Sequence, residues 1–495
     1  MRQLSGLDAA FLNLETPSAP LHVASVLLAD SASDDGPVGF DEIQRTVASR
    51  LGRLAPFRWR LADVPLGIDH PYWVDDPDFD VEYHIRRIGV PLPGDYGQLA
   101  ELVARIHARP LDRSRPLWEM YVIEGLDTGE LAVYTKMHHA AIDGVSGAEI
   151  LTVLLDTEPV PPPMDVPDPP PGERVPSPSE LWVRGTLNLA RRPWRAAQTA
   201  VRTARALPYM GRMVGLALPA MSALAFGPDL LDRPRLQAPP TPLNTTITPH
   251  RSFAFGSLSL DRIKDVKNRH GVSVNDVVMA ICAGALRSYL LDHDALPDQP
   301  LQAMVPLSVR TDEEKGAMGN RVTSMVSVLP THLADPMARL QAAHAAMNVA
   351  KRHNAIPADL LRDYSQFVAP ALAARAARVV ARVRWADRVR TPVNLVISNV
   401  PGPGFPLYLA GARLRHLYPV SAIAESIGLN ITLQSYRSHV DFGLVSCREV
   451  APDLWKLMDH IHSALDGLEA ADQPKRRTSG RSSGGGSRGR QPPAG

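Results

Sequence analysis

The chain has 495 residues, 45% of them hydrophobic, which is enough apolar material for two domains. Its formal net charge of +1 identifies no partner, and without a nucleic-acid-binding motif we expect no nucleic-acid partner. The only two cysteines, Cys282 and Cys447, are far apart, which excludes a disulfide scaffold and is typical of a reduced intracellular protein. The N-terminus has no apolar signal segment, and no apolar run is long enough to span a membrane.

Residues 1–157 alternate strand-like and helix-like patterns, which predicts a first α/β subdomain. The predicted elements are a strand at 22–28, helices at 40–50 and 99–108, a strand at 131–137 and a helix at 147–155. Residues 158–250 are predicted to be a linker. Its first part is rich in proline and therefore stiff and extended, and its second part, 181–226, has seven arginines, no acidic residue and interleaved Trp and Leu side chains. This second part is a basic amphipathic stretch.

Residues 251–470 are predicted to form a second α/β subdomain. Helices are expected at 261–270, 274–292, 336–352 and 452–468, and Ser273 is a candidate N-cap for the second of them. Strands are expected at 253–260, 301–307, 323–329, 393–398, 429–436 and 439–446. The remaining tail, 471–495, is rich in Gly, Ser, Arg and Pro and is predicted to be disordered.

The most informative segment is 138–144, a HHxxxDG string that directly follows the strand predicted at 131–137. Alternation along a strand directs neighbouring side chains to opposite faces, so His138 and His139 cannot have the same role if the strand persists. His139 at the end of this strand suits a general base in a cleft. Asp143 follows shortly after, and Gly144 lets the chain turn away.

Other interpretations of this string are a pair of structural histidines or a metal site, but no cysteine or further histidine with metal-ligand spacing lies nearby. A serine nucleophile is poorly supported, because Ser146 does not lie in a nucleophile elbow. The GxSxG and GxGxxG strings at 480–489 lack a preceding strand and a following helix. A lone histidine base therefore favours direct attack of a hydroxyl on an activated acyl group, such as a thioester.

The HHxxxDG string resembles the signature of the CoA-dependent acyltransferase superfamily, which shares the chloramphenicol-acetyltransferase-like fold with nonribosomal-peptide condensation domains. Further strings resemble one branch, the bacterial wax ester synthase/diacylglycerol acyltransferases, and particularly the actinobacterial triacylglycerol synthases. These strings are LSGLDAAF at 4–11, PLHV at 20–23, RPLWE at 115–119, VND at 274–276, VPLSVR at 305–310, GN at 319–320 and SNVPGP at 398–403. The resemblance implies two chloramphenicol-acetyltransferase-like subdomains of mixed sheet and helices, with the active site at their interface.

The resemblance also implies roles for individual residues. His139 would be the general base and His138 would support the site. Asp143, together with Gly144, would shape the loop, with Arg310 as the candidate partner of the Asp143 carboxylate. A buried Asp–Arg pair holds orientation and is costly to break from one side, although Arg310 could also be an ordinary surface residue.

One further residue and two further segments each have a functional and a purely structural interpretation. Asn275 could donate a hydrogen bond to the oxyanion or position its helix, or it could be only a helix N-cap. Residues 116–118 could shape an acyl pocket or a domain contact, or simply pack in the core. Residues 398–403 could form a tight loop beside the substrate tunnel, or only a turn.

The same resemblance implies a long-chain acyl-CoA donor, used as a co-substrate without a cofactor or metal, and a diacylglycerol or long-chain alcohol acceptor. The basic amphipathic stretches at 181–226 and 371–390 favour peripheral attachment to the inner face of the membrane or to a lipid droplet, although both could be solvated helices. Two alternatives stay open. One is a condensation-type enzyme that acylates a complex lipid or polyketide hydroxyl from a carrier-bound donor, and the other is a non-catalytic lipid-surface protein.

Overall fold

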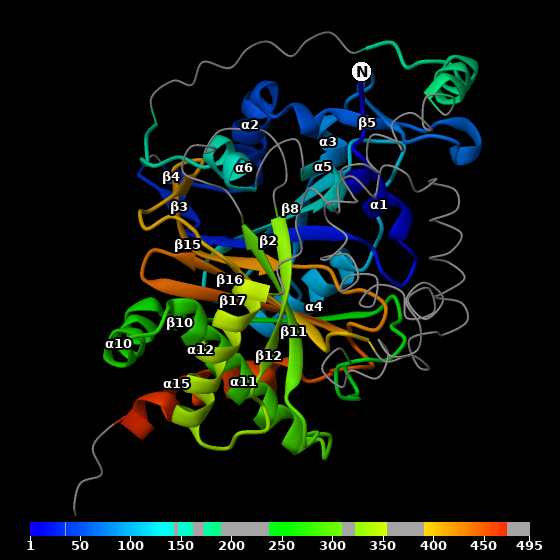
Figure 1. Cartoon of the computed structure of the whole chain (residues 1–495). Helices are drawn as coiled ribbons and strands as arrows, with labels where there is room; N and C mark the ends of the chain where they lie inside the picture. The colour runs from blue at the N-terminus through cyan, green and yellow to red at the C-terminus, as the bar shows by residue number, and fades with distance from the viewer. Residues whose placement is uncertain are drawn as a thin grey trace, which may run out of the picture.

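The computed structural model describes residues 1–34, 36–142, 147–161, 173–188, 190, 237–308, 322–353 and 391–472. Two six-stranded sheets organise these residues (Figure 1). The first sheet has the order β14 (Tyr408–Leu409), β15 (Ala412–Val420), β2 (His22–Ala29), β9 (Leu131–His138), β8 (Trp118–Glu124) and β7 (Ile85–Gly89). Its β7–β8 pair is parallel and its other pairs are antiparallel, so this is a mixed sheet, as predicted.

The second sheet is mixed as well, because its β16–β13 and β13–β11 pairs are parallel and its other pairs are antiparallel. Its order is β10 (Arg251–Ser259), β17 (His439–Cys447), β16 (Leu429–Tyr436), β13 (Leu395–Val400), β11 (Leu301–Ser308) and β12 (Val322–Leu329). A smaller sheet contains β1 (Arg2–Gln3), β6 (Tyr72–Asp75) and β5 (Trp59–Ala62), and β3 (Ala32–Ser33) pairs with β4 (Gly36–Pro37).

The helices fall into two groups. Those of the N-terminal half are α1 (Gly6–Leu14), α2 (Phe40–Arg50), α3 (Val81–His84), α4 (Tyr96–His107), α5 (His139–Ile142) and α6 (Gly147–Leu154). Those of the C-terminal half are α10 (Leu260–His270), α11 (Val274–Asp292), α12 (Pro336–His353) and α15 (Leu454–Asp472). The helix boundaries follow local chemistry: Ser273 caps α11 as predicted, with its hydroxyl accepting from the Asp276 N–H, and Gly271 ends α10 in the left-handed region with φ 63°.

Three large hydrophobic clusters form most of the core of the described residues. One lies between the second sheet and α11, α12 and α15, and another lies between the first sheet and α1, α2, α5 and α6. The third contains side chains of both halves, such as Leu99 of α4, Tyr134 of β9, Tyr418 of β15 and Phe255 of β10. Because this cluster is shared, the two sheets pack against each other as one body.

The first sheet also draws on the end of the chain. Residues 408–420 lie within the predicted second subdomain, yet β14 and β15 extend the N-terminal sheet, where β15 pairs with β2. In Figure 1 the orange β15 accordingly lies beside the blue β2. The sheets therefore do not divide the chain at a single point. The reason is that strand pairing depends on which edge is available in three dimensions, and local sequence does not encode this choice.

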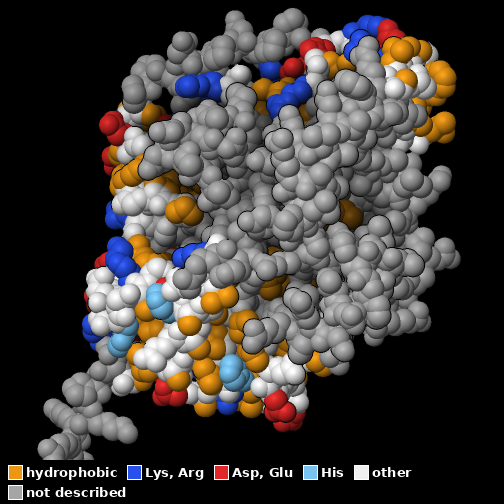
Figure 2. Space-filling model, in the orientation of Figure 1, with side chains coloured by type: hydrophobic (Ala, Val, Ile, Leu, Met, Phe, Trp, Pro, Cys, Tyr) orange, Lys and Arg blue, Asp and Glu red, His pale blue; other side chains and the backbone are white. Residues whose placement is uncertain are grey.

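Part of the predicted linker is helical, at 178–188. Leu181 packs into a small cluster with β5 and β6, and a Cβ on Gly185 would come within 2.8 Å of Val64, so this helix lies close to the small sheet. Trp182 and Leu187 are 48% and 56% exposed, and Figure 2 shows hydrophobic side chains gathered over this helix at the upper right. Residues 189 and 191–226, the stretch 371–390 and the tail from 473 lie outside the described residues.

One described helix, α11, is long and apolar enough to cross a membrane. Of its most apolar window, 72% is buried inside the fold, which is the behaviour of a core helix. Both cysteines are buried and free, Cys282 on α11 and Cys447 at the end of β17.

Candidate active site

The two histidines of the motif lie where β9 meets α5. β9 ends at His138 and α5 begins at His139, so the strand does not continue through the pair as the alternation argument assumed. Each backbone N–H is nevertheless fixed: His138 donates to the Leu117 carbonyl at 2.9 Å, and His139 donates to the Leu21 carbonyl at 3.0 Å. The strings at 115–119 and 20–23 therefore contribute the carbonyls that hold the two histidine backbones.

The two imidazoles have different surroundings. His139 is half-buried and stacks on Phe11 of α1, with ring centroids 3.9 Å apart and an interplanar angle of 21°. His138 is only 1% exposed, and its Nδ1 accepts the backbone N–H of Ala140 at 3.1 Å. His139 is thus the more accessible imidazole, while the imidazole of His138 is buried and bonded to the backbone of α5. The role of His139 as the base stays a prediction.

A buried carboxylate lies behind His138. Glu15, at the C-terminal end of α1, places one oxygen 3.5 Å from His22 Nε2 and the other 3.7 Å from His138 Nε2. Arg113 donates to the same carboxylate at 2.5 Å. Burial acts to raise the pKa of the Glu15 carboxyl, but its contacts with His138, His22 and Arg113 hold that pKa well below its usual range. Glu15 is therefore an anion inside the fold.

His22 is the cross-strand partner of His138, because β2 and β9 pair in the register His22–His138. Its side chain is fully buried, and burial lowers the pKa of this imidazole to about 4 despite the opposing effect of Glu15. His22 is therefore neutral at pH 7. The nearby His107 is also buried, with a pKa lowered well below its usual value by burial, and it contacts the Tyr134 hydroxyl at 2.8 Å.

A buried lysine lies on the same strand, two residues before His138. Lys136 is fully buried and pairs with Glu119 of β8 at 3.2 Å. Its ammonium also donates to the carbonyls of Ile106 and Arg109, at the end of α4. Burial lowers the pKa of Lys136, and Glu119 opposes this effect. These partners compensate the charge of the Lys136 ammonium and connect β9 to β8 and to the end of α4.

Asn275 lies in the C-terminal half, at the second position of α11. It is not the helix cap, since that position belongs to Ser273. The Asn275 side-chain oxygen accepts from the Asn399 amide at 3.2 Å, so the structure brings the VND and SNVPGP strings together. The next residue of the helix, Asp276, accepts from His344 of α12 at 2.8 Å. Asn275 thus joins α11 to β13, and the alternative of a helix cap was wrong.

Of the remaining resemblance strings, RPLWE and SNVPGP have clear structural roles, and GN at 319–320 lies outside the described residues. Trp118 is fully buried, donates to the Phe57 carbonyl at 2.7 Å and stacks on His84, so 116–118 packs in the core. Ser398–Val400 belong to β13, and a Cβ on Gly402 would lie 2.0 Å from the Ser435 carbonyl oxygen, so only glycine fits there. Asp143, Gly144 and Arg310 lie outside the described residues, and the Asp143–Arg310 pair remains a prediction.

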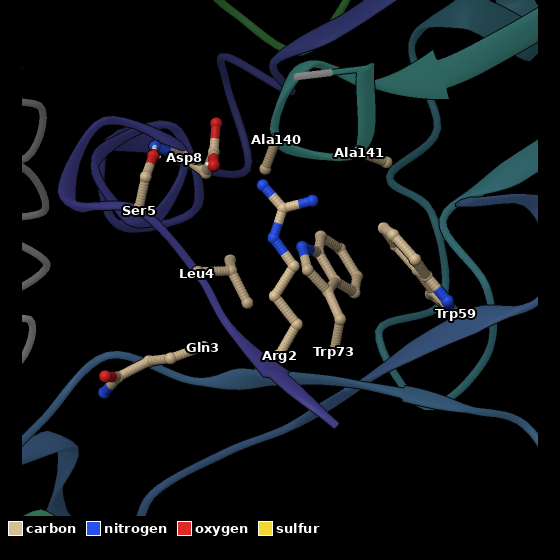
Figure 3. Close-up of a pocket in the computed structure, with 9 residues that line it drawn as sticks. All are labelled: Arg2, Gln3, Leu4, Ser5, Asp8, Trp59, Trp73, Ala140 and Ala141. Atoms are coloured by element: carbon tan, nitrogen blue, oxygen red, sulfur yellow. Dashed lines mark hydrogen bonds between the residues drawn. The ribbon is translucent and has the colours of Figure 1, made fainter. Parts of the chain in front are cut away.

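A small pocket lies beside α5 and the start of the chain (Figure 3). It is lined by Arg2, Gln3, Leu4, Ser5, Asp8, Trp59, Trp73, Ala140 and Ala141. In Figure 3 the Arg2 side chain extends across it toward Ala140. Its volume of about 10 Å³ has room for one water molecule, so it is a packing defect next to the motif and too small for a substrate.

A larger cavity of about 520 Å³ has a charged lining. Its lining residues are Arg60, Leu61, Asp63, Asp76, Asp78, Arg113, Ser114 and Arg115. The motif histidines do not line it, but Arg113 connects its wall to Glu15. Among the residues that the structure describes, no group of three or more His, Cys, Asp or Glu side chains is arranged to hold a metal ion.

The sequence reasoning did not identify Phe11, Glu15 or Lys136 as part of this region. Phe11 ends the LSGLDAAF string, and Glu15 lies between that string and PLHV. The position of Glu15 between two strings that resemble the same family was the available signal. Nothing in the local sequence indicates that its carboxylate faces His138, which lies more than a hundred residues further along the chain.

Comparisons with known proteins cover nearly the whole chain. The family model described as the wax ester synthase/diacylglycerol acyltransferase catalytic domain matches residues 4–278, and the WS/DGAT C-terminal domain matches residues 318–469. The Mycobacterium tuberculosis protein named probable diacylglycerol O-acyltransferase tgs2 is 40% identical over 471 residues, which are 94% of this chain and 98% of that protein. The O-acyltransferase WSD of Acinetobacter baylyi is 32% identical over 477 residues, which are 95% of this chain and 97% of that protein.

Solved structures agree with this assignment. The wax ester synthase/diacylglycerol acyltransferase from Marinobacter aquaeolei VT8 superimposes with a TM-score of 0.65 at 31% identity, over 94% of this chain and 99% of that one. The starter condensation domain of a rhizomide synthetase, at 12% identity and a TM-score of 0.51 over 96% and 95% of the two chains, shares the fold alone. The chain therefore belongs to the wax ester synthase/diacylglycerol acyltransferase family of O-acyltransferases.

Proposed function

We propose that this acyltransferase moves a long-chain acyl group from acyl-CoA to the hydroxyl of diacylglycerol, and also of a long-chain alcohol, with His139 as the general base. The observation that carries the proposal is the placement of His139 as the first residue of α5, directly after β9, where it is half-buried and stacked on Phe11. The chain also matches its relatives over almost their full length. The name of the Mycobacterium tuberculosis relative supports the diacylglycerol acceptor, and the descriptions of the family model and of the Marinobacter structure, which include wax ester synthase, support the alcohol acceptor.

The chemistry proceeds in three steps. A ring nitrogen of His139 removes the proton of the acceptor hydroxyl, and the hydroxyl oxygen attacks the carbonyl carbon of the thioester. The tetrahedral intermediate collapses as its carbon–sulfur bond breaks, and the imidazolium of His139 returns the proton to the CoA thiolate. Acyl-CoA is a co-substrate in this scheme, and the steps require no resident cofactor, because the thioester already carries an activated acyl group.

The test measures release of free thiol from palmitoyl-CoA by the purified protein. The reaction is run with diacylglycerol, with hexadecanol and without acceptor, and the lipid product is identified by mass spectrometry. Triacylglycerol or wax ester that forms only with the matching acceptor supports the proposal and ranks the acceptors. The His139→Ala variant serves as the control for catalysis by the motif.

Each of the other outcomes has a clear meaning. Thiol release that does not depend on an acceptor contradicts the transferase activity and indicates a thioesterase. No release from palmitoyl-CoA, together with turnover of a carrier-bound thioester, favours the condensation-type alternative. Vesicle binding without any turnover favours a non-catalytic lipid-surface protein.

We further propose that the protein works in the cytoplasm on the inner face of the membrane or on a lipid droplet. The support is the helix at 178–188, whose Leu181 and Gly185 face the fold while Trp182, Val183 and Leu187 are exposed (Figure 2). Exposed Trp and aliphatic side chains beside arginine are typical of interfacial helices.

Sedimentation with vesicles that contain anionic lipid tests this location. The double substitution Trp182→Ser and Leu187→Ser is expected to lower the bound fraction. The matched control is Leu291→Ser, at an exposed leucine on α11 that is 50% accessible. Equal binding by both variants would contradict a role for this helix.

A further inference from the structure

One helix contacts both histidines of the motif. Phe11 and Glu15 are four residues apart on α1 and at its end, which places them on one helix face. Phe11 stacks on His139 with ring centroids 3.9 Å apart, and the Glu15 carboxylate lies 3.7 Å from His138 Nε2. α1 also packs directly on α5, the short helix that begins at His139.

The Glu15 carboxylate is enclosed by the groups that it faces. Its side chain is 10% exposed, while those of His22 and His138 are 0% and 1% exposed. Arg113, which is 44% exposed, supplies the positive charge that balances it from the solvent side. An enclosed carboxylate with one cationic partner keeps its charge, so it exerts a fixed field on the two imidazoles.

The hydrogen bonding of His138 determines which of its nitrogens carries the proton. Nδ1 accepts the Ala140 N–H at 3.1 Å, so Nδ1 has a lone pair and the proton of the neutral ring is on Nε2. Nε2 is the atom that faces Glu15, and a carboxylate favours a proton at that position. His138 is also the residue before α5, and its Nδ1 satisfies an N–H of the first turn, as an N-cap side chain does.

These contacts connect Glu15 to His139 through one turn of helix. The Glu15 carboxylate lies on the Nε2 side of His138, the Nδ1 of His138 accepts from the first turn of α5, and α5 carries His139 as its first residue. Phe11, one helical turn before Glu15, stacks on the imidazole of His139 and so restricts its orientation. We propose that Glu15 and Phe11 are positioning residues of the acyl transfer, which together orient His139. The inference rests on the proposed role of His139 as the base.

The first experiment compares kcat and KM for Glu15→Gln, Glu15→Asp and Glu101→Gln. Glu101 is the matched control, since it also pairs with an arginine, Arg105, but is 55% exposed on α4. Gln keeps the size of Glu15 and removes its charge, so kcat is expected to fall about 10- to 100-fold with little change in KM, as for a misplaced catalytic group. Aspartate keeps the negative charge on a side chain that is one methylene shorter, so Glu15→Asp should retain part of the kcat that Glu15→Gln loses.

The second experiment needs no substrate. Diethyl pyrocarbonate modifies accessible neutral imidazoles, and mass spectrometry of the peptide that contains His139 gives its modification rate. In Glu15→Gln and in Phe11→Leu this rate is expected to rise several-fold, because His139 is less well held, while Glu101→Gln should match the wild type. If Glu15→Gln does not fold, the Phe11→Leu variant still tests whether α1 orients His139.

The outcomes separate this inference from the proposed function. A lower kcat and a higher modification rate, with partial recovery in Glu15→Asp, support it. The inference is overturned if Glu15→Gln behaves like Glu101→Gln, or if Glu15→Asp is as impaired as Glu15→Gln. A wild-type protein that transfers no acyl group, but whose His139 still responds to Glu15→Gln, would contradict the proposed substrates and leave the positioning intact.

Discussion

The buried carboxylate of Asp441 is expected to be a main link between the two sheets, and its removal tests that idea. Asp441 lies on β17 of the second sheet and is fully buried. One of its oxygens accepts the backbone N–H of Leu417 on β15 at 2.7 Å, and the other accepts the Ser257 hydroxyl at 2.6 Å and contacts His416 Nδ1 at 3.1 Å. The Leu417 N–H needs this side chain, because β14 is too short to pair with that part of β15.

The expected cost follows from the donors left without an acceptor. In Asp441→Ala, the buried Leu417 N–H loses its partner, which costs about 1–3 kcal/mol, and loss of the charged hydrogen bond from Ser257 adds about 1.5 kcal/mol. We therefore expect the free energy of unfolding to fall by about 2.5–4.5 kcal/mol. In Asp441→Asn, the amide oxygen can still accept from Leu417, and the loss should be about 1 kcal/mol.

Urea denaturation followed by circular dichroism at pH 7 measures both losses. The control is Asp466→Ala, since Asp466 is 66% exposed and its pair with Arg262 should contribute less than about 1 kcal/mol. The reasoning is refuted if Asp441→Ala lies within about 1 kcal/mol of the wild type, or if Asp441→Asn costs as much as Asp441→Ala.

Three further predictions follow from the site and the core. His139→Ala should lower kcat about 10²- to 10⁴-fold and leave the melting temperature nearly unchanged, as acyl-transfer assays and circular dichroism can measure. Gly443→Ala would place a Cβ 1.7 Å from the Pro419 carbonyl oxygen, so β17 and β15 must separate and urea denaturation should show a loss of about 3 kcal/mol or more. Burial lowers the pKa of His22 to about 4, below the 6.5 of the unfolded chain, so the unfolded state binds more protons between these values. Stability from His22 should therefore be lost as the pH falls from 6.5 toward 4, by about 1.4 kcal/mol per pH unit in urea denaturation.

Each of these predictions has its own control. His462→Ala replaces an exposed histidine on α15 and should keep full turnover, and a His139→Ala enzyme that is equally active would remove His139 from the mechanism. Gly404→Ala adds a Cβ with no atom within 4 Å and should be nearly neutral, so equal losses at Gly404 and Gly443 would contradict the argument from close approach. His22→Gln should weaken the pH dependence, and an unchanged slope in that variant would show that other groups cause it.

Most of the regular structure of the C-terminal half could be predicted locally. The helices at 40–50 and 274–292 and the strand at 429–436 agree with the predicted bounds to the residue, because their apolar periodicity and their capping residues are properties of short segments. In the first sheet β7, β8, β14 and β15 were not predicted, and neither was α1. The sequence of β15 contains Arg413, Arg415 and Pro419, and it forms a strand because the edge of β2 is available to it.

Residue types at fixed spacing were sufficient to identify the family and the two histidines of the motif. The sequence alone did not determine how the histidines are used. Local alternation assumed a strand through His139, whereas the strand ends at His138 and a helical turn presents the next residue. Only the packing of α1 on α5 brings Glu15 next to His138 and Phe11 onto the imidazole of His139. The physical reason is that a buried charge has to be compensated by whatever group the fold brings next to it, and only the tertiary structure selects that group.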